Sequence, residues 1–189
     1  MEKIIEQIFA ESIAVKQATL KANLQQIKQA AEAMITALQA SRKIMFCGNG
    51  GSAADSQHIA AEFIGRFQKE RRSLPAIALT TDSSILTALG NDYGFDIVFA
   101  RQVEGLGNAG DVLVGLSTSG NSKNVLEAMK TAKAKGIKTI GLLGCDGGTI
   151  APLCDIALIV PSKVTARIQE SHICMAHAIC QITEDELSK

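Results

Sequence analysis

From residue 43 to the C-terminus, short apolar runs alternate with longer segments of helical spacing, and this alternation limits the fold more than any other feature of the sequence. Strands that alternate with helices form a parallel sheet covered by helices on both faces. The sequence therefore predicts a three-layer α/β/α sandwich around a five-stranded parallel sheet. The predicted strands are 43–47, 75–79, 111–116, 137–143 and 156–160, and the predicted helices are 52–67, 82–90, 95–106, 122–135 and 164–187, with a short helical turn at 149–153.

The N-terminal segment 1–40 contains neither Pro nor Gly, and its apolar side chains recur at helical spacing. We expect two helices there, with a break near Ala22–Asn23. They either pack on the sheet of their own chain or meet the same helices of a second subunit, and the sequence leaves both arrangements open. The chain is predicted to be a single domain over 1–189, with segment 1–40 as a candidate oligomer contact and an α/β core over 43–189.

The net charge, the apolar runs and the cysteines limit the partners and the compartment that we expect. The chain has 19 basic and 19 acidic residues, so its net charge gives no general attraction to nucleic acid or to an anionic membrane. No apolar run approaches the roughly 20 residues that a membrane helix needs, and acids interrupt the apolar N-terminus, unlike a signal peptide. The cysteines are odd in number and form no CxxC pair, which indicates a reducing compartment, and we expect a cytoplasmic protein. They are Cys47, Cys145, Cys154, Cys174 and Cys180.

The turn after the first predicted strand, at 48–52, is rich in glycine, which lets the backbone approach a ligand closely. Ser52 and Asp55 fit a capping box for the helix that follows. The same stretch also fits a dinucleotide fingerprint, but that motif needs an acid about 20 residues further on. The nearest acid after the second strand is Asp82, about 32 residues past Gly50. A purely structural turn is a third possibility.

The turn after the third strand, at 117–122, has four hydroxyl side chains and one amide directly before a helix. Hydroxyl donors, loop N–H groups and the positive end of a helix can hold a phosphate monoester without a basic pocket. The alternative is that these side chains only cap the helix. One serine is enough for a cap, so the number of hydroxyls favours an anion site.

His58 and Glu62 lie one helical turn apart, so they share a face of their predicted helix. Together they can bind a metal, or the carboxylate can act as a base that the imidazole orients. The alternative is that Glu62 pairs with Arg66 on a solvated face.

The last predicted helix carries Gln169, His172 and His177. At 100° per residue, His177 lies about 80° from Gln169 around the helix and about 12 Å along it, and about 140° from His172. The two histidines therefore do not share a face. His177 has apolar neighbours in sequence and is interpreted as a core residue unless another part of the fold supplies a partner.

Taken together, these motifs resemble the sugar isomerase (SIS) domain family and, within it, the phosphoheptose isomerases. The resemblance extends over nearly the whole chain. The motifs that carry it are CGNGGSAADSQH at 47–58 with Glu62, GND at 90–92, STSGNS at 117–122, and ARIQE at 166–170 with His177.

The resemblance implies a flavodoxin-like SIS fold and an aldose–ketose isomerisation of sedoheptulose 7-phosphate through an enediolate, the first step of ADP-heptose synthesis for lipopolysaccharide. It implies one zinc ion per subunit, a homotetramer with sites at subunit contacts, and Glu62 and His177 as the acid–base pair. The implied metal ligands are His58, Glu62, Gln169 and His177. The implied substrate-binding residues are Asn49, Gly50, Gly51, Ser52, Glu62, Asn91, Asp92, Ser117, Thr118, Ser119, Ser122 and Gln169.

Two questions stay open at this stage. A carboxylate that binds zinc is a weaker base, so either Glu62 leaves the metal during turnover, or the zinc is structural and His177 does more of the proton transfer. The alternative function is a non-catalytic relative that binds a phosphosugar or a replication initiator. Retention of both Glu62 and His177 favours the enzyme, since a binding protein has no chemical need for either.

Overall fold

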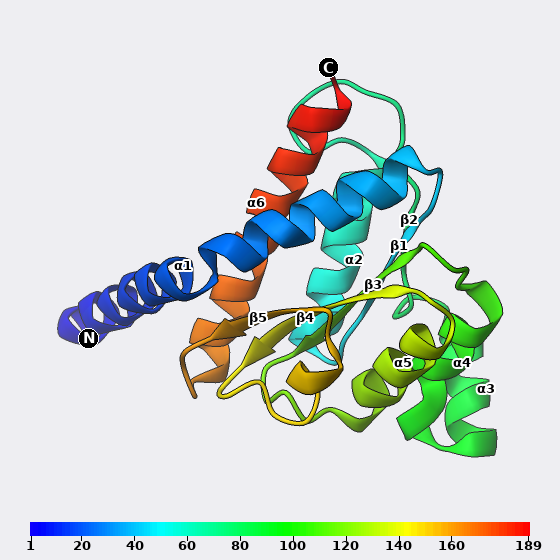
Figure 1. Cartoon of the computed structure of the whole chain (residues 1–189). Helices are drawn as coiled ribbons and strands as arrows, with labels where there is room; N and C mark the ends of the chain where they lie inside the picture. Colours follow the sequence, from blue (N-terminus) through cyan, green and yellow to red (C-terminus); the bar gives the residue numbers. More distant parts are fainter.

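Five parallel strands form the middle layer of the computed structural model, which describes residues 1–189 (Figure 1). Their order across the sheet is β2-β1-β3-β4-β5. The predicted α/β/α fold class is confirmed, and every predicted strand boundary lies within one residue of the observed one. The strands are β1 (Ile44–Cys47), β2 (Ala76–Ala78), β3 (Val112–Ser117), β4 (Lys138–Gly144) and β5 (Ile156–Val160).

Helices cover both faces of the sheet because successive strand residues point to opposite sides. Ile44 and Phe46 join the core under α1, α2 and α6, whereas Met45 and Cys47 join the core under α4 and α5. The helices are α1 (Glu2–Gln39), α2 (Gly51–Ile64), α3 (Ser83–Tyr93), α4 (Val98–Leu106), α5 (Lys123–Ala134) and α6 (Thr165–Leu187), with 3₁₀ turns at Phe95–Ile97 and Ala151–Leu153.

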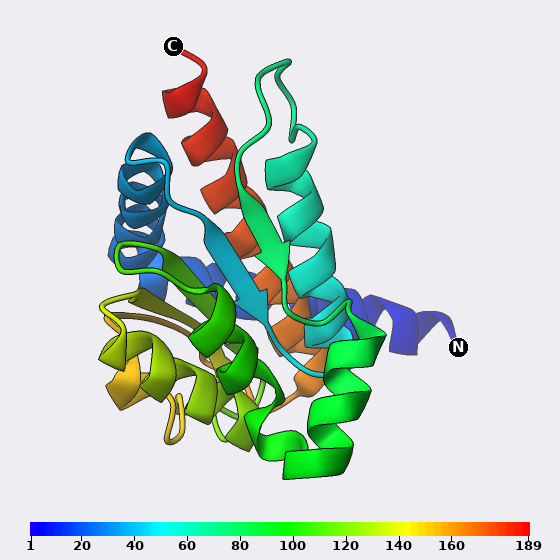
Figure 2. The same ribbon diagram turned by 90° about the vertical axis from the view of Figure 1, so that its right-hand side faces the viewer.

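Segment 1–40 is one helix, so the predicted break near Ala22–Asn23 is wrong. The Asn23 side chain, which suggested a break, is used across the fold instead. Its Nδ2 donates to the carbonyls of Thr19 and Ile159 at 2.9 Å each, and its Oδ1 accepts from the N–H of Ile159 at 2.8 Å. Asn23 therefore pairs with the edge strand β5 as another strand would. The helix bends along its length, and its N-terminal part projects away from the sheet (Figures 1 and 2).

The switch in strand order lies between β1 and β3. The chain runs from β1 outward to β2 and then returns to the other side of β1 to form β3. Since the two strands are parallel neighbours, the loops that follow them lie together at the carboxyl edge of the sheet. Ligands of such sheets bind at this place.

None of the helices combines the length and the apolar character that crossing a membrane would require. All five cysteines are free thiols in the structure.

Candidate functional site

The loops after β1 and β3 are joined by a pair of side-chain amides. Asn49 and Asn124 each donate to the other's carboxamide oxygen, at 2.9 and 2.8 Å. Asn124 is buried in the first turn of α5 and was not identified from the sequence. Its only signal there is its position two residues after the hydroxyl-rich turn. This pair fixes the two loops relative to each other.

Hydroxyl side chains surround the start of α5, as the sequence predicted. The hydroxyls of Ser117 and Ser122 lie 2.9 Å apart, Ser119 Oγ accepts from the N–H of Asn121 at 3.1 Å, and Thr118 lies half-buried between them. Ser122 is the N-cap residue, yet its side chain accepts no hydrogen bond from the helix. Helix capping therefore does not account for Ser122, and the positive end of α5 remains available to an anion.

Glycine is required at position 120 of this loop. Gly120 has φ +68°, and a side chain there would meet the backbone of Gly147. Beside it, Asn121 Oδ1 accepts from the N–H and the hydroxyl of Thr149 at 3.0 and 3.1 Å. The loop after β4 thus packs against the hydroxyl-rich loop 117–122 and holds it in place.

The start of α2 has no side-chain cap. Gly50, with φ +55°, is the N-cap residue. The predicted capping box of Ser52 and Asp55 is wrong, because α2 begins one residue before Ser52. Ser52 is buried inside the helix, and its N–H donates to the carbonyl of Asn49 at 3.0 Å. The first N–H groups of α2 are therefore free of a side-chain acceptor, whereas in α5 the N–H of Val125 donates to Asn124 Oδ1 at 3.0 Å.

The dinucleotide interpretation has no support in the structure. The fingerprint requires an acid at the end of β2 that can bind a ribose. Asp82 is instead the N-cap of α3 and accepts from the N–H of Ile85 at 2.9 Å.

Helices α2 and α6 run side by side in the same direction (Figure 1). Contacts occur in order along both helices. Gly51 meets Gln169 near the start, His58 meets His177 in the middle, and Phe67, just past the end of α2, bonds to Glu184. Residues distant in sequence are thus brought together in register.

His58 and His177 form the centre of the candidate active site. Their Nε2 atoms lie 2.8 Å apart, and Glu62 Oε1 lies 3.6 Å from His58 Nε2. His58 is therefore the partner from another part of the fold without which His177 was interpreted as a core residue. The alternative pairing of Glu62 with Arg66 is not observed, because the Arg66 side chain pairs with Glu70 at 3.6 Å.

Two further residues border this pair and were not identified from the sequence. The Phe67 ring lies 5.4 Å from the His177 ring, centroid to centroid. Burial raises the pKa of Asp55 above its usual value, while the nearby His58 and His177 oppose that rise. The sequence indicated Asp55 only as part of the predicted capping box, although it lies three residues before His58.

Gln169 lies at the other end of the helix pair from the histidines. Its carboxamide occupies the space where a side chain at position 51 would lie, so Gly51 is required for this close approach. Gln169 makes no hydrogen bond to His58, Glu62 or His177, and Gly51 precedes His58 by seven residues, about 10 Å along a helix. Within this chain the structure brings together three of the four predicted metal ligands.

Two other expectations can be compared with the structure. Asn91 and Asp92 are exposed at the end of α3, and the only side-chain hydrogen bond of either is the one between them, at 2.8 Å. No contact joins them to the two loops. His172 is fully buried with its Nε2 3.0 Å from the carbonyl oxygen of Leu143, so it lies on a different face from His177, as expected.

The donor atoms around His177 are imidazole nitrogens and a carboxylate oxygen, which are types of ligand that zinc binds. No three His, Cys, Asp or Glu side chains are close enough together to hold a metal. However, nitrogen ligands of one tetrahedral zinc lie about 3.3 Å apart, given Zn–N distances near 2.0–2.1 Å. The imidazole nitrogens, 2.8 Å apart, and the Glu62 oxygen, 3.6 Å from His58 Nε2, are within about half an ångström of this spacing.

Comparisons with known proteins identify the family and its fold. The SIS domain family model matches residues 7–144. A phosphoheptose isomerase of a Nitratiruptor species is 66% identical over 151 residues, which cover 80% of this chain and 81% of the relative. One of Sulfurimonas denitrificans is 50% identical over 190 residues, which cover 99% and 97%. The solved structure of phosphoheptose isomerase GmhA from Neisseria gonorrhoeae matches with a TM-score of 0.92 and 52% identity, over 97% of this chain and 98% of that one.

Proposed function

This chain belongs to the SIS domain family, and we propose that it acts as a phosphoheptose isomerase, converting sedoheptulose 7-phosphate to D-glycero-D-manno-heptose 7-phosphate. The observation that carries the proposal is that His58 contacts both His177 and Glu62, near the two loops that precede α2 and α5. Acid–base groups and a phosphate site are the two elements that this reaction requires.

The chemistry is a proton transfer between neighbouring carbons. Glu62 removes a proton from C1 of the ketose, which forms an enediolate, and returns a proton to C2, so that the carbonyl moves to C1. His177 moves the remaining proton between the two oxygens, a task that suits an imidazole near neutral pH. Because both groups face the same space between α2 and α6, one pair can serve both carbons.

Phosphate binding is assigned to the two loops. The N–H groups at the starts of α2 and α5 and the hydroxyls of Ser117, Thr118, Ser119 and Ser122 would hold the phosphate, while Asn49, Gly50, Gly51 and Ser52 form the other wall. The extended substrate separates C2 from the phosphorus by roughly 9 Å, at about 1.5 Å per C–C bond. This is comparable to the roughly 10 Å from Gly51 to His58 along α2. Asn91, Asp92 and Gln169 complete the proposed substrate set.

We assign one zinc ion to His58, Glu62 and His177, with Gln169 as a fourth ligand only if another subunit supplies it, because within the chain Gln169 lies at Gly51, away from the histidines. A bound zinc would act as a Lewis acid toward the oxygens of the enediolate. The chain's own carboxylate and imidazole still have to move the protons, and Glu62 does so only when it is free of the metal. Metal analysis of the purified protein tests this assignment.

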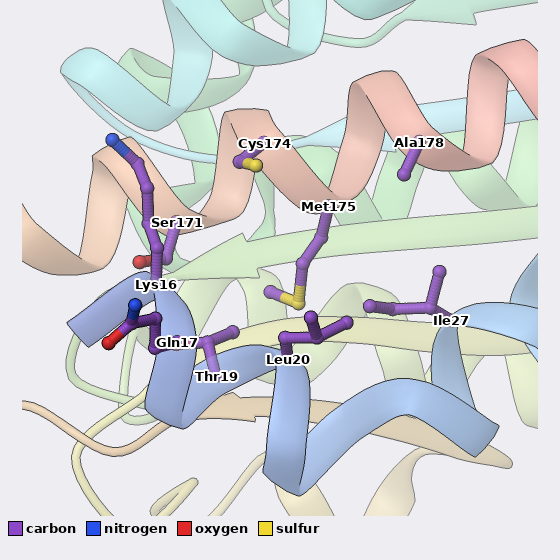
Figure 3. Close-up of a pocket in the computed structure, with 9 residues that line it drawn as sticks. All are labelled: Lys16, Gln17, Thr19, Leu20, Ile27, Ser171, Cys174, Met175 and Ala178. Carbon is purple, nitrogen blue, oxygen red and sulfur yellow. The ribbon is translucent and has the colours of Figure 1, made fainter. Parts of the chain in front are cut away.

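Self-association is proposed from the exposed apolar face of α1. Phe9, Ile13, Leu20 and Leu24 share this face, and each is more than half exposed. Between α1 and α6 lies a groove of about 270 Å³ that is lined mainly by apolar side chains, among them Leu20 and Met175 (Figure 3). A patch of this kind on one helix is typical of a subunit contact. We propose a homotetramer, and a monomeric native mass of 20.0 kDa would contradict it.

The proposed setting is cytoplasmic, at the entry to ADP-heptose and lipopolysaccharide synthesis. The zero net charge and the five free thiols support this setting. The alternative, a non-catalytic protein that binds a phosphosugar or a replication initiator, does not explain why Glu62 and His177 lie in the same space.

The test is conversion of sedoheptulose 7-phosphate to the aldose by the purified protein. Glu62→Gln and His177→Ala should each lower kcat by about 10²–10⁴-fold, the range that acid–base groups contribute. Circular dichroism should show that both variants stay folded. Glu70→Gln is the matched control, because Glu70 is a nearby carboxylate with an 89% exposed side chain. Normal turnover by both site variants would overturn the assignment, and absence of activity in the wild type would overturn the proposed function.

A further inference from the structure

The loop between α2 and β2, residues 65–75, passes beside the C-terminal end of α6 (Figures 1 and 2). A single buried carboxylate on α6 binds this loop. Glu184 accepts the backbone N–H groups of Phe67, Gln68 and Lys69 at 2.8, 2.7 and 2.8 Å. It also accepts Arg71 Nε at 3.0 Å, and its side chain is only 2% exposed.

Arg71 connects the same carboxylate to the end of α2. Its guanidinium donates to the carbonyl oxygens of Glu62 and Phe63 at 2.8 and 3.0 Å, and to that of Gly65 at 3.2 Å. These groups belong to the last turn of α2, where carbonyls lack helical partners. The Arg71 side chain is 5% exposed, so the bonds are shielded from water.

Both ends of the network lie next to the acid–base pair. At one end Arg71 holds the backbone of Glu62 itself. At the other, Glu184 holds the backbone of Phe67, whose ring lies against the ring of His177 at 5.4 Å. Glu184 also follows His177 by seven residues, two turns along α6. One ion pair therefore connects the helix that carries Glu62 to the helix that carries His177.

We propose that Arg71 and Glu184 are positioning residues, which hold Glu62 and His177 at the separation that proton transfer requires. The proposal rests on the proposed function for its kinetic consequence. Neither residue faces the substrate loops, so both act through the backbone of α2 and through Phe67. Replacing a buried ion pair by apolar residues is often neutral or stabilising, so stability alone does not explain the presence of this pair.

The main test is Glu184→Gln. The amide places an N–H donor opposite backbone N–H groups, so the loop should loosen while the charge change stays local. We expect kcat to fall by about tenfold to a hundredfold, the scale of small misplacements of catalytic groups, with KM changed by less than about twofold because the phosphate loops are intact. Amide exchange of Phe67, Gln68 and Lys69 should accelerate, and the ring resonances of His177 should shift as the Phe67 ring moves.

Asp185→Asn is the matched control. Asp185 follows Glu184 on α6 and bonds to Lys69 of the same loop at 2.6 Å, but both side chains are about half exposed. This variant should keep the kinetics and the His177 resonances of the wild type. Arg71→Lys should retain only part of the wild-type kcat. An ammonium group cannot bond to several carbonyls at once as the guanidinium does.

Phe67→Leu tests the positioning of His177 if the Glu184→Gln protein does not fold. It removes the ring beside His177 and leaves the backbone bonds to Glu184 in place. A lower kcat with an unchanged KM supports the proposal. Normal kcat in Phe67→Leu, or in a folded Glu184→Gln protein with rapidly exchanging loop amides and unchanged His177 resonances, overturns it. If the wild type does not isomerise the heptose phosphate, the proposed function fails, and the His177 resonances of Glu184→Gln still decide whether the ion pair positions His177.

Discussion

The two ends of the α2–α6 helix pair are built in opposite ways. At the open end, formed by Gly50, Gly51 and Gln169, the first turn of α2 has no side-chain cap and the helices approach over a glycine. At the closed end, formed by Arg71 and Glu184, the backbone groups of the loop and of the last turn of α2 are bound by buried charges. The histidines of the candidate site, His58 and His177, lie between them. The difference shows that buried charges bind the backbone groups at one end of the pair, whereas the first N–H groups of α2 at the other end have no side-chain partner.

The largest effect on stability should come from breaking the closed end. Arg71→Met leaves Glu184 buried without a counter-charge, so the free energy of unfolding should fall by about 3–5 kcal/mol. Lys69→Met removes the exposed partner of Asp185 and should change it by less than about 1 kcal/mol. Urea denaturation at one fixed protein concentration measures both. Similar small losses in the two variants would mean that the closed end is not specially stabilised.

Measuring the free energy of unfolding against pH separates the contribution of His172, in the middle of α6, from that of the closed end. Burial lowers the pKa of His172 to about 4, against the opposing effect of its bond to Leu143. The unfolded chain therefore takes up this proton near pH 6.5 while the native chain does not, so stability falls between about pH 6.5 and 4, by about 3 kcal/mol in total.

The closed end should respond only at lower pH. Burial alone would raise the pKa of Glu184, but the N–H groups of Lys69, Gln68 and Phe67 and the charge of Arg71 hold it below its usual value. Its stabilisation is present above the unfolded pKa, near 4.3, and is lost as the pH falls through the folded pKa. His172→Gln should remove the slope between pH 6.5 and 4.5 and keep the loss below it. An unchanged slope in this variant would assign the titration to another group.

The smallest effect should come from filling the open end. Gly51→Ala places a methyl group where the Gln169 carboxamide lies, and because this flexible side chain can move aside, the cost should be below the roughly 1–3 kcal/mol of overpacking in a core. Adding Gln169→Ala makes room and should restore most of the lost stability. A double-mutant cycle by thermal unfolding measures the coupling between the two positions. Additive losses would show that the two residues do not compete for the same space.

Much of the fold followed from the sequence, because strands of a parallel sheet are buried on both faces and appear as uninterrupted apolar runs. The two loops were located in the same way, since they follow strands one and three of that pattern. The failures have local causes. Asn23 looked like a helix break because its hydrogen-bonding partner, Ile159, is 136 residues away. Ser52 fitted a cap motif, but α2 begins at Gly51.

The sequence by itself determined the order of the elements from β1 onward, the two candidate anion-binding loops and the candidate pair of Glu62 and His177. Only the tertiary structure decided which of several similar charged residues has a buried role. Arg71 and Arg72 are neighbours, as are Glu184 and Asp185, yet in each case the first is buried in the ion pair and the second is exposed or half-exposed. Local sequence cannot make this choice, because the desolvation of a charge depends on what the rest of the chain packs against it.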